Sequence, residues 1–593
     1  MAMPTITASI SYGRVALGNT QFVHSELISE IPGARFHGKG EDYWTVPLSW
    51  VSLVCLVNTF AEKLELSEEL TAWATYEWES KIGPCTELRT GEGESFVTDE
   101  LLEQIAELVP ESRSPIKPVN RRYQVAGALL LATAKRYLLL DEQGTGKMTE
   151  TAMALSLYPD TLPALIVAPS STLYTWRREL GVFGIDSVIL DGSAVQRRKM
   201  VEQFRDDETG PRVMICSYAI VAKHSRVAPY GNIKLSDDHR TPKDLNEIAW
   251  ATVVADEVHR AKSPKAVQTR ALWAVSDHAE YRWGLSGTPI EGSPLDFWAL
   301  LHFIDPVSWP SSVKYRDRWV EHFINFFGGI EVQGIRADRA EEWRRTTEWQ
   351  WRRKMLEGLP PRTNEFRFCE LKGKALKTYK DMEKQLMAET GDDDVVLFAQ
   401  NHMVKAGRLL QMANSAIQVE TSYDDDGEEV IEVTPIEPSP KLDLMMDTLE
   451  DFEGVPLILW FDKVKFMRLA QDRLNAKGIK YVLIDGSMQP KARDASVAAF
   501  QNGDVDLILL SVAAAAEGIT LTRAPVSINV QRNWSLILND QKGSRNLRIG
   551  SEIHDEILEI DLITQGTIEW DQYMDLEEKR KIRDQVISPL SVS

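Results

Sequence analysis

Short runs of apolar residues alternate with helical patterns in two separate blocks of this sequence. In residues 120–305 the runs are YLLLD, ALIVAPS, VMICSY, TVVADE and YRWGLSGTP, and in residues 441–570 they are VPLILWFD, IKYVLIDGS, VDLILLSV, APVSINVQ and HDEILEIDLIT. Continuous apolar runs separated by helices are typical of parallel strands covered on both faces. The sequence therefore predicts two doubly wound α/β sheets, with polar chemistry at the carboxyl ends of their strands.

Length and composition limit the class of protein. A chain of 593 residues is too long for one core and predicts about three or four domains. No apolar run approaches the roughly 20 residues that span a bilayer, and the N-terminus MAMPTITASISYGR lacks the features of a secretory signal. The four cysteines are far apart and form no C-x-x-C pair, which argues against a zinc site or a disulfide framework. We therefore expect a cytoplasmic protein without membrane segments.

A glycine-rich turn joins a strand to a helix in LLLDEQGTGKMTE, residues 138–150. Gly144, Thr145 and Gly146 let backbone N–H groups approach a phosphate closely, and the N-terminus of the following helix adds its positive end. Lys147 then spans the β and γ phosphates. A simple surface turn is the alternative, but the flanking strand and helix favour a phosphate-binding loop.

Met148 stands where such a loop needs a hydroxyl group to hold Mg²⁺. A thioether is a poor ligand for a hard cation, and Thr149 is one position late and projects elsewhere. Mg²⁺ then relies on Asp256, water and the phosphates, which predicts slow turnover. An engineered or inactivating change at this position is the other interpretation.

Further charged groups follow two of the other apolar runs. Asp256 and Glu257 end the run TVVADE, where the first acid can hold Mg²⁺ and the second can orient or deprotonate a water. Arg545 and Arg548 in QKGSRNLRIG are three apart, which places them on one face of a helix. From the second sheet they could reach a γ-phosphate. Solvated charge is the alternative for each, but their order favours one cluster with Lys147 and Asp141.

Taken in order, these segments resemble the motifs of Swi/Snf-type ATPases of helicase superfamily 2. DEQGTGK resembles the family's DEMGLGK, DEVH its DEAH, and LSGTPIEGSPLDFWALLHFIDP its LTGTP segment. In the second block, YVLIDGSMQPKARDASVAAFQNG and LLSVAAAAEGITLT fit in order. The resemblance covers residues 120–570 and implies an enzyme that binds ATP and Mg²⁺ and hydrolyses ATP. It also implies that Tyr123 stacks on the adenine, that Gln124 hydrogen-bonds it, and that Gly518 contacts the nucleotide.

The resemblance also implies the fold class. We expect an α/β protein with two tandem RecA-like domains, a helical insertion and a small N-terminal α+β accessory domain. The expected boundaries are 1–110 for the accessory domain, 111–305 for the first RecA-like domain, 306–440 for the insertion with an acidic loop, and 441–593 for the second RecA-like domain.

The expected nucleic-acid contacts also come from the resemblance. In this family one strand of duplex DNA lies across both RecA-like domains, and most contacts are to phosphates. The candidates are Ser170, Ser171, Thr172 and Trp176 in the first domain, and Gly486, Ser487, Arg493 and Thr520 in the second. Such contacts predict no base specificity and a strong salt dependence. The net charge of −21 repels nucleic acid at long range, so this interpretation requires local basic surface.

Three other segments bear on nucleic-acid binding. The segment IPGARFHGKGEDYWTVPLS weakly resembles the HARP-type module of annealing helicases, which implies contacts from Arg35, Lys39 and Trp44 to forked or branched DNA; a structural hairpin is the alternative. Residues 420–438 contain eight acids and no base. We interpret this segment as a solvated hairpin or loop, or alternatively as a DNA-mimicking gate. The third segment is EEWRRTTEWQWRRKMLEGLPPRTNEFR. It offers either a basic aromatic surface or, for the tryptophans, core packing; the residues concerned are Arg344, Arg345, Trp349, Trp351, Arg352, Arg353 and Lys354.

The expected function is therefore ATP-driven translocation on double-stranded DNA that remodels or anneals branched DNA. One alternative is a nucleotide-gated DNA-binding protein with little or no hydrolysis, which Met148 motivates. Another is an RNA-remodelling helicase, which the Trp-rich basic insertion and the Leu-Pro-Pro segment disfavour. Compact proteins of this type occur in bacteria and their phages, so we expect bacterial or phage-infected cytoplasm and a role in DNA repair.

Overall fold

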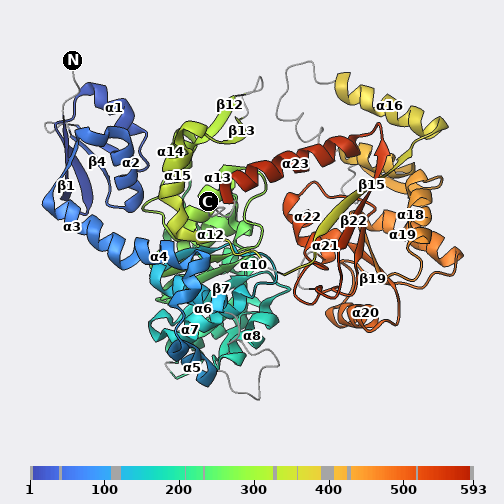
Figure 1. The fold of residues 1–593 in the computed structure, drawn as a ribbon, viewed down its shortest axis with the longest axis horizontal. Coiled ribbons are helices and arrows are strands. Elements are labelled where there is room, and N and C mark those ends of the chain that lie inside the picture. The colour runs from blue at the N-terminus through green and yellow to red at the C-terminus, as the bar shows by residue number, and fades with distance from the viewer. Residues whose placement is uncertain are drawn as a thin grey trace. The chain divides into compact units, whose positions relative to one another are not determined.

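The structure is a computed structural model that describes residues 5–38, 43–108, 122–207, 209–231, 234–324, 330–356, 358–388, 406–423, 429–515 and 519–587. The chain forms two compact units, one of residues Met1–Met355 with Ile582–Ser593 and one of residues Leu356–Lys581. Figure 1 labels their helices and strands. Two expected contact residues, Lys39 and Gly518, lie outside the described residues.

Unit 1 begins with a small mixed sheet, in the order β3-β4-β2-β1-β5. The segment with a structural hairpin as its alternative interpretation, IPGARFHGKGEDYWTVPLS, contains the antiparallel pair β3–β4. Helix α3 begins after Ser67, whose hydroxyl accepts a hydrogen bond from the Leu70 N–H, 3.2 Å away. The elements of this N-terminal module are β1 (Ile6–Ser11), β2 (Arg14–Gly18), α1 (Phe22–Ser29), β3 (Arg35–His37), β4 (Tyr43–Pro47), α2 (Trp50–Phe60), β5 (Leu64–Leu66) and α3 (Glu68–Glu77).

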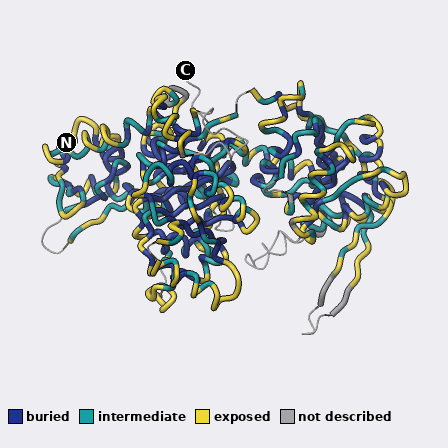
Figure 2. The backbone as a smooth tube through the Cα atoms, turned by 90° about the horizontal axis from the view of Figure 1, so that it is seen from below, coloured by how far each residue is buried: buried dark blue, intermediate teal, exposed yellow. Residues whose placement is uncertain are grey.

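The main sheet of unit 1 has seven parallel strands in the order β14-β6-β11-β10-β7-β9-β8. All five predicted strands are present, and the short strands β8 and β14 extend the sheet at its two edges. These strands are buried along their length because helices cover both faces (Figure 2). The strands are β6 (Arg136–Leu139), β7 (Ala164–Ala168), β8 (Ser187–Ile189), β9 (Val213–Ser217), β10 (Thr252–Asp256), β11 (Tyr281–Leu285) and β14 (Trp351–Arg352).

Helices on the two faces of this sheet belong to two apolar clusters. One cluster is shared with the N-terminal module, so that module and the sheet are parts of one packed body. The helices of this part are α4 (Gly83–Leu88), α5 (Asp99–Leu108), α6 (Arg122–Ala134), α7 (Lys147–Leu157), α8 (Leu173–Val182), α9 (Ala194–Asp206), α10 (Tyr218–His224), α11 (Asp237–Arg240), α12 (Val267–Val275) and α13 (Pro294–Ile304).

The residues expected as an insertion, 306–440, are divided between the two units. In unit 1 they form α14 (Ser312–Trp319), the hairpin β12 (Val320–Ile324) and β13 (Ile330–Ile335), α15 (Ala340–Thr347) and β14. Trp349 and Trp351 are 3% and 4% exposed, so the core-packing alternative holds and the basic aromatic surface is wrong. Arg344 of α15 pairs with Glu341 and Glu348.

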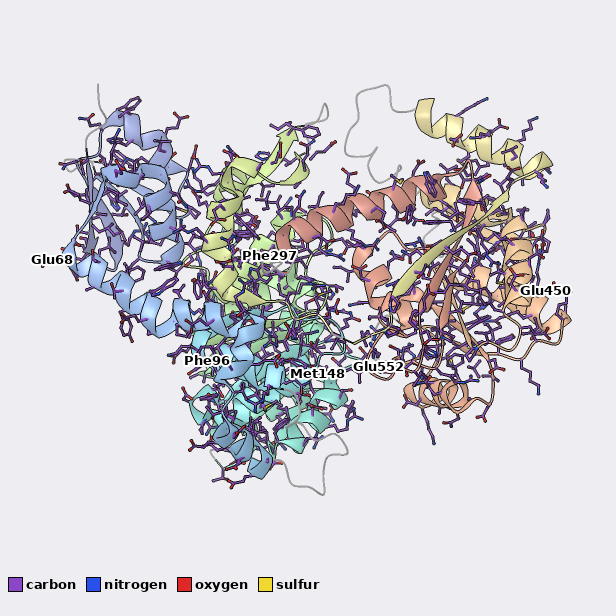
Figure 3. The ribbon with its side chains drawn as sticks, in the orientation of Figure 1. Glu68, Phe96, Met148, Phe297, Glu450 and Glu552 are labelled. Atoms are coloured by element: carbon purple, nitrogen blue, oxygen red, sulfur yellow. The ribbon has the colours of Figure 1, made fainter. Side chains whose placement is uncertain are left out.

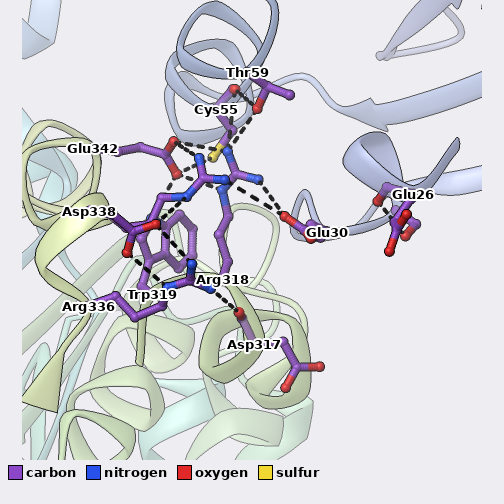
Figure 4. Close-up of polar contacts among 12 residues, drawn as sticks. Glu26, Glu30, Cys55, Thr59, Asp317, Arg318, Trp319, Arg336, Asp338 and Glu342 are labelled. Carbon is purple, nitrogen blue, oxygen red and sulfur yellow. Dashed lines mark hydrogen bonds and ion pairs between the residues drawn. The ribbon is translucent and has the colours of Figure 1, made fainter. Parts of the chain in front are cut away.

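A buried ion pair joins α14 and α15 to the N-terminal module (Figure 4). The Arg318 guanidinium donates to Glu342 at 2.6 and 3.0 Å and to the Thr59 hydroxyl of α2 at 3.0 Å. The Cys55 thiol lies 3.9 Å from the Glu342 carboxylate, and burial raises the pKa of that thiol to about 12, so it stays protonated. The module is therefore joined to α14 and α15 by charge-assisted hydrogen bonds as well as by apolar contacts.

Unit 2 contains a parallel sheet of six strands in the order β15-β22-β21-β18-β20-β19. The five predicted strands are present, and β15, from the expected insertion, forms one edge. Apolar clusters cover both faces. The strands are β15 (Arg362–Glu370), β18 (Leu457–Phe461), β19 (Val482–Ile484), β20 (Leu507–Ser511), β21 (Val526–Asn529) and β22 (Ile557–Gln565).

Two parallel sheets and a small mixed N-terminal sheet confirm the predicted α/β fold class. In unit 2 the antiparallel strands β16 (Ala416–Tyr423) and β17 (Glu429–Ile436) contain described parts of the acidic segment, while residues 424–428 lie outside the described residues. None of the helices in the described part of the chain has the length and apolar character needed to cross a membrane. The helices of unit 2 are α16 (Gly373–Ala388), α18 (Pro440–Asp451), α19 (Val464–Ala476), α20 (Pro490–Asn502), α21 (Val512–Ala515), α22 (Leu536–Gly543) and α23 (Ile568–Ile587), whose last residues belong to unit 1.

The buried ion pair between Arg318 and Glu342 makes a testable prediction. Arg318→Ala leaves the buried Glu342 carboxylate without its main partner and should lower the free energy of unfolding by about 3 kcal/mol. Urea unfolding followed by tryptophan fluorescence measures this loss. Arg316→Ala, which removes an exposed ion pair from the same helix, is the control and should change stability by less than about 0.5 kcal/mol. Equal unfolding midpoints for the two variants would contradict the assignment.

Candidate active site

The carboxyl ends of β6, β10 and β11 meet at one edge of the first sheet. Parallel pairing places Asp256 beside Leu285 and Leu285 beside Leu139. Because these strands end in register, the segments that follow them are neighbours: the glycine-rich loop after β6, Glu257 after β10 and Ser286 after β11. The structure therefore gathers at one edge the motifs that lie more than a hundred residues apart in the sequence.

The glycine-rich loop is held by its own lysine and by α6. Lys147 Nζ donates to the carbonyl oxygens of Asp141 and Glu142 at 2.7 and 2.9 Å. Gly146 has φ +93°, and a Cβ there would lie 2.2 Å from Gln124 Nε2, so only glycine fits. Tyr123 Oη and Gln124 Nε2 both donate to the Thr145 carbonyl, at 2.7 and 2.6 Å. The two residues expected to read adenine thus contact the loop directly, while Gly144 at its tip is exposed.

The residues after the lysine place no hydroxyl at position 148. Met148 is half-buried on α7 and packs against the apolar cluster of that face of the sheet (Figure 3). The Thr149 hydroxyl donates to Glu179 Oε1 of α8 at 2.5 Å. The hydroxyl one position late is therefore engaged with α8, and the thioether side chain serves packing.

Asp256 is buried and its carboxylate is held by two donors. Trp176 Nε1 donates to Oδ2 at 2.8 Å, and the Glu257 N–H donates to Oδ1 at 3.0 Å. Burial, and then the charge of Glu257, raise the pKa of Asp256 to about 7, while the Trp176 hydrogen bond and Lys147 act in the opposite direction. Trp176 is fully buried, so its expected place on a nucleic-acid surface is wrong: it positions Asp256 instead.

Glu257 adopts a strained backbone conformation beside a polar cluster. Its φ is +49°, a left-handed value that non-glycine residues seldom adopt. Its carboxylate lies 3.2 Å from His259 Nδ1 and 3.4 Å from the Ser286 hydroxyl, which is itself 3.0 Å from His259 Nδ1. The GLSGTP segment thus supplies a partner for Glu257, which the sequence analysis left without one.

Arg352 is buried next to the loop, and its basic neighbours Arg353 and Lys354 are half-buried. Its guanidinium is hydrogen-bonded to the Asp141 carboxylate and donates to Glu150 Oε2 at 2.7 Å. Asp141 was expected in a metal–phosphate cluster with Lys147, but its carboxylate contacts Arg352 and only its carbonyl contacts Lys147. Neither this role of Arg352 nor any role of Glu150 is indicated by the neighbouring sequence.

Lys147 is electrostatically coupled to the acids around it. Burial lowers the pKa of Lys147, and the charges of Glu257, Asp141, Glu150 and Asp256 oppose that shift. In the described part of the chain, no group of three or more His, Cys, Asp or Glu side chains is arranged to hold a metal ion. This donor set suits a cation that takes one or two protein carboxylates and keeps phosphate and water ligands, as Mg²⁺ does.

Three of the first-sheet nucleic-acid candidates lie where α8 begins. Ser170 and Ser171 are exposed, and Thr172 is half-buried at the position that precedes the helix. Its hydroxyl donates to the Pro169 carbonyl at 3.1 Å. These three residues are accessible, unlike Trp176 one turn later.

The candidates of unit 2 form two local groups. After β19, Gly486 and Ser487 are exposed, and Ser487 Oγ and Arg493 Nη2 both donate to Asp485, at 2.6 and 3.4 Å. The other group is formed by Thr520, whose hydroxyl accepts a hydrogen bond from Arg548 Nη1 at 2.9 Å.

The two arginines after α22 are not on a helix. The helix ends at Gly543, and both Arg545 and Arg548 lie in the turns beyond it, so the predicted helical face is wrong. Arg545 is buried, and Arg548 donates through Nε to the Ser544 carbonyl at 2.9 Å. Burial lowers the pKa of Arg548 to about 10.

Comparison with known proteins agrees with this geometry. The SNF2-related domain family matches residues 54–418, more than half of the chain, and the helicase conserved C-terminal domain matches residues 440–550. The chain therefore belongs to the SNF2-related family of ATPases and carries a helicase C-terminal domain.

Individual relatives are distant. Mouse chromodomain-helicase-DNA-binding protein 1-like is 26% identical over 79% of this chain and 50% of that protein, and Bacillus subtilis YwqA is 25% identical over 81% of this chain and 50% of that protein. The chain thus spans half the length of these two curated relatives. The Sulfolobus solfataricus SWI2/SNF2 ATPase core in complex with double-stranded DNA is 20% identical over 79% of this chain and 97% of that chain, with a TM-score of 0.34. A TM-score this low supports no inference about this chain.

The hydrogen bond from Trp176 to Asp256 predicts a pH effect. A donor to the ionised carboxylate lowers its pKa, so Trp176→Phe should raise the pKa of Asp256 above its value of about 7. Asp256 is expected to act ionised, and activity then falls as the pH falls through this pKa. The acid limb of the kcat/KM profile for ATP hydrolysis should move to higher pH by about one unit.

Trp283→Phe is the matched control, because that buried indole donates to the Leu131 carbonyl at 3.0 Å, away from Asp256. An acid limb that stays in place for Trp176→Phe, or moves equally in both variants, would show that Trp176 does not act on Asp256.

Proposed function

We propose that this chain is an ATP-dependent translocase that moves on double-stranded DNA. The observation that carries the proposal is the position of Lys147, Asp256 and Glu257 at one sheet edge, since the loop of Lys147 follows β6 and the two acids follow β10, on either side of β11. A phosphate-binding loop beside two strand-terminal acids is the arrangement that phosphoryl transfer requires. The family assignment supports the same conclusion.

The residues of unit 1 have separable roles in this proposal. Lys147 and the backbone amides of Gly144, Thr145 and Gly146 bind the phosphates. Asp256 would hold Mg²⁺, which supplies neutralisation of phosphate charge when bound. Glu257, oriented by His259 and Ser286, positions the attacking water and accepts its proton. Tyr123 would stack on the adenine and Gln124 would hydrogen-bond it, and both already contact the loop at Thr145.

Arg545 and Arg548 of unit 2 are proposed to complete the site. A guanidinium near the γ-phosphate stabilises the charge that develops during transfer. Burial of Arg545, and the contacts of Arg548 to Ser544 and Thr520, fix both side chains before nucleotide binds. Such pre-organisation lowers the entropy that catalysis would otherwise have to supply.

Double-stranded DNA is the proposed track. The mouse relative is named as DNA-binding, and the exposed residues at the start of α8 and after β19 are small or basic groups that suit phosphate contacts. Forked or branched DNA is the proposed preferred form, through the N-terminal module. There Arg35 and Phe36 are exposed, and the ring of Phe36 lies 5.2 Å from that of Trp44.

A nucleotide-gated binding protein with slow hydrolysis is the second candidate function. The observation that favours it is Met148, which packs on an apolar cluster where a magnesium-binding hydroxyl is expected. In this case nucleotide binding would control DNA affinity, and turnover would contribute little.

One ATPase assay tests these candidates. Hydrolysis is measured without nucleic acid and with single-stranded DNA, duplex DNA, forked DNA and RNA of equal length, with Lys147→Ala as the inactive control. The proposal expects at least about tenfold stimulation by duplex DNA, with forks as good or better. Failure of every DNA to stimulate would overturn it, and stronger stimulation by RNA would replace the substrate class.

Met148 gives a separate prediction. Met148→Thr restores a hard oxygen ligand and should raise kcat about tenfold at limiting Mg²⁺, with little change at saturating Mg²⁺. Met148→Leu keeps the apolar packing without adding oxygen, so it should behave like the original protein. If the threonine and leucine variants have the same Mg²⁺ dependence, residue 148 does not control metal use.

A further inference from the structure

The Arg352 side chain forms hydrogen bonds to three parts of the candidate nucleotide site. Besides the Asp141 and Glu150 carboxylates, its guanidinium donates through Nη1 to the Tyr123 carbonyl at 3.0 Å. Asp141 begins the glycine-rich loop, Glu150 lies in the first turn of α7 after it, and Tyr123 belongs to α6, which contacts the loop at Thr145. One side chain therefore contacts the residues at both ends of the loop and also α6, which packs against the loop.

The backbone around Arg352 is joined to the same loop. The Leu140 N–H donates to the Arg352 carbonyl at 2.8 Å, and the Glu142 N–H donates to the Lys354 carbonyl at 3.0 Å. In return the Lys354 N–H donates to Asp141 Oδ1 at 2.8 Å. Residues 352–354 thus continue the pairing of β14 with β6 beyond the end of the strand, into the loop itself.

This segment is also the last part of unit 1 before the chain enters unit 2 at Leu356. A change in the loop would reach residues 352–354 through these hydrogen bonds without crossing any other element. The segment therefore connects the loop to unit 2 through these hydrogen bonds and the peptide bonds that follow them.

Stability alone does not account for a buried arginine with two buried carboxylates. Removing three charged groups from water costs free energy that their mutual attraction often only balances. The planar guanidinium does fix direction, because its N–H groups form a rigid fork that reaches several acceptors at set angles. The close packing is visible at Gly127, where a Cβ would lie 1.8 Å from Glu150 Oε2 and 2.8 Å from Arg352 Nη2.

Lys147 makes this arrangement responsive to a ligand. Its ammonium contacts the Asp141 and Glu142 carbonyls, and it has to leave them to reach a phosphate. The Asp141 residue released in this way remains bonded to Arg352 and Lys354 through its carboxylate. A phosphate at the loop is thereby linked to residues 352–354 by a chain of two residues.

We propose that Arg352 is a positioning residue that fixes the phosphate-binding loop and transmits its occupancy to residues 352–355, the segment that leads into unit 2. This inference rests on the proposed function only in requiring that the loop binds nucleotide. It assigns to Arg352 no contact with the nucleotide.

Hydrogen–deuterium exchange on the full chain tests the proposal, with Mg²⁺ and a non-hydrolysable ATP analogue as the probe. In the original protein the analogue should change exchange at residues 140–147 and at residues 352–356 together. Arg352→Lys keeps the charge but cannot make the three-way contact. The analogue should then still protect the loop, bind about tenfold more weakly and leave residues 352–356 unchanged.

Two variants keep the test interpretable. Glu150→Gln retains an acceptor for Arg352 while removing one charge, and should weaken binding about threefold in the same direction, even if Arg352→Lys fails to fold. Arg344→Lys changes a half-buried, ion-paired arginine on α15; it is the control and should match the original protein.

The outcomes separate this inference from the proposed function. A purely structural role predicts faster exchange in both segments and a lower Tm, with an undiminished response to nucleotide at residues 352–356; that result would overturn the inference. If DNA stimulates hydrolysis but the analogue changes exchange only in the loop, the proposed function stands and the role of Arg352 in transmission is rejected. If both segments respond to the analogue but no DNA stimulates hydrolysis, the inference stands and the proposed function is rejected. Absence of nucleotide binding would reject both.

Discussion

Burial of negative charge at the carboxyl edge of the first sheet is the constraint on which the nucleotide site depends. Asp141 and Glu150 are fully buried and Asp256 nearly so. A buried carboxylate destabilises a fold unless hydrogen bonds or an opposite charge compensate it. Here the compensating groups are Arg352 and Trp176, which come from segments far along the chain. Satisfying these acids therefore fixes the loop, α8 and the segment after β14 in one arrangement.

The second sheet follows the same principle. Asn529 is the last residue of β21 and Asp561 lies within β22, and each is 1% exposed. Asn529 Nδ2 donates to Asp561 Oδ1 at 2.8 Å. Arg532 donates to Asp561 at 2.5 Å, and Lys542 of α22 donates to Asn529 at 2.6 Å. This network holds α22 in place. The turns that follow α22 contain Arg545 and Arg548, the two arginines proposed to act on the γ-phosphate. In both units, then, buried polar contacts hold the functional segments while apolar clusters hold the sheets.

Local sequence predicted the strands and the loop well, because a buried parallel strand is a continuous apolar run and a phosphate-binding loop needs glycines at fixed places. It failed where a side chain's partner is distant. Arg352 lies in a basic, Trp-rich stretch typical of exposed surface, and only Asp141 and Glu150, some two hundred residues earlier, explain its burial. Trp176 was assigned to DNA for the same reason, since its partner Asp256 is eighty residues away. The strand β14 has two residues and shows no apolar run. The end of α22 was missed although Lys542 and Gly543, a basic residue and a glycine, are signals of a helix C-terminus.

The central claim is that the edge of the first sheet binds nucleotide phosphate through Lys147 while Arg352 holds the loop from beneath. The most direct measurement is an experimental structure with Mg²⁺, a non-hydrolysable ATP analogue and duplex DNA. The account predicts that Lys147 Nζ leaves the Asp141 and Glu142 carbonyls for the γ-phosphate, while Arg352 keeps both carboxylates. A nucleotide bound elsewhere, or a lysine still bonded to those carbonyls beside a bound nucleotide, would contradict it.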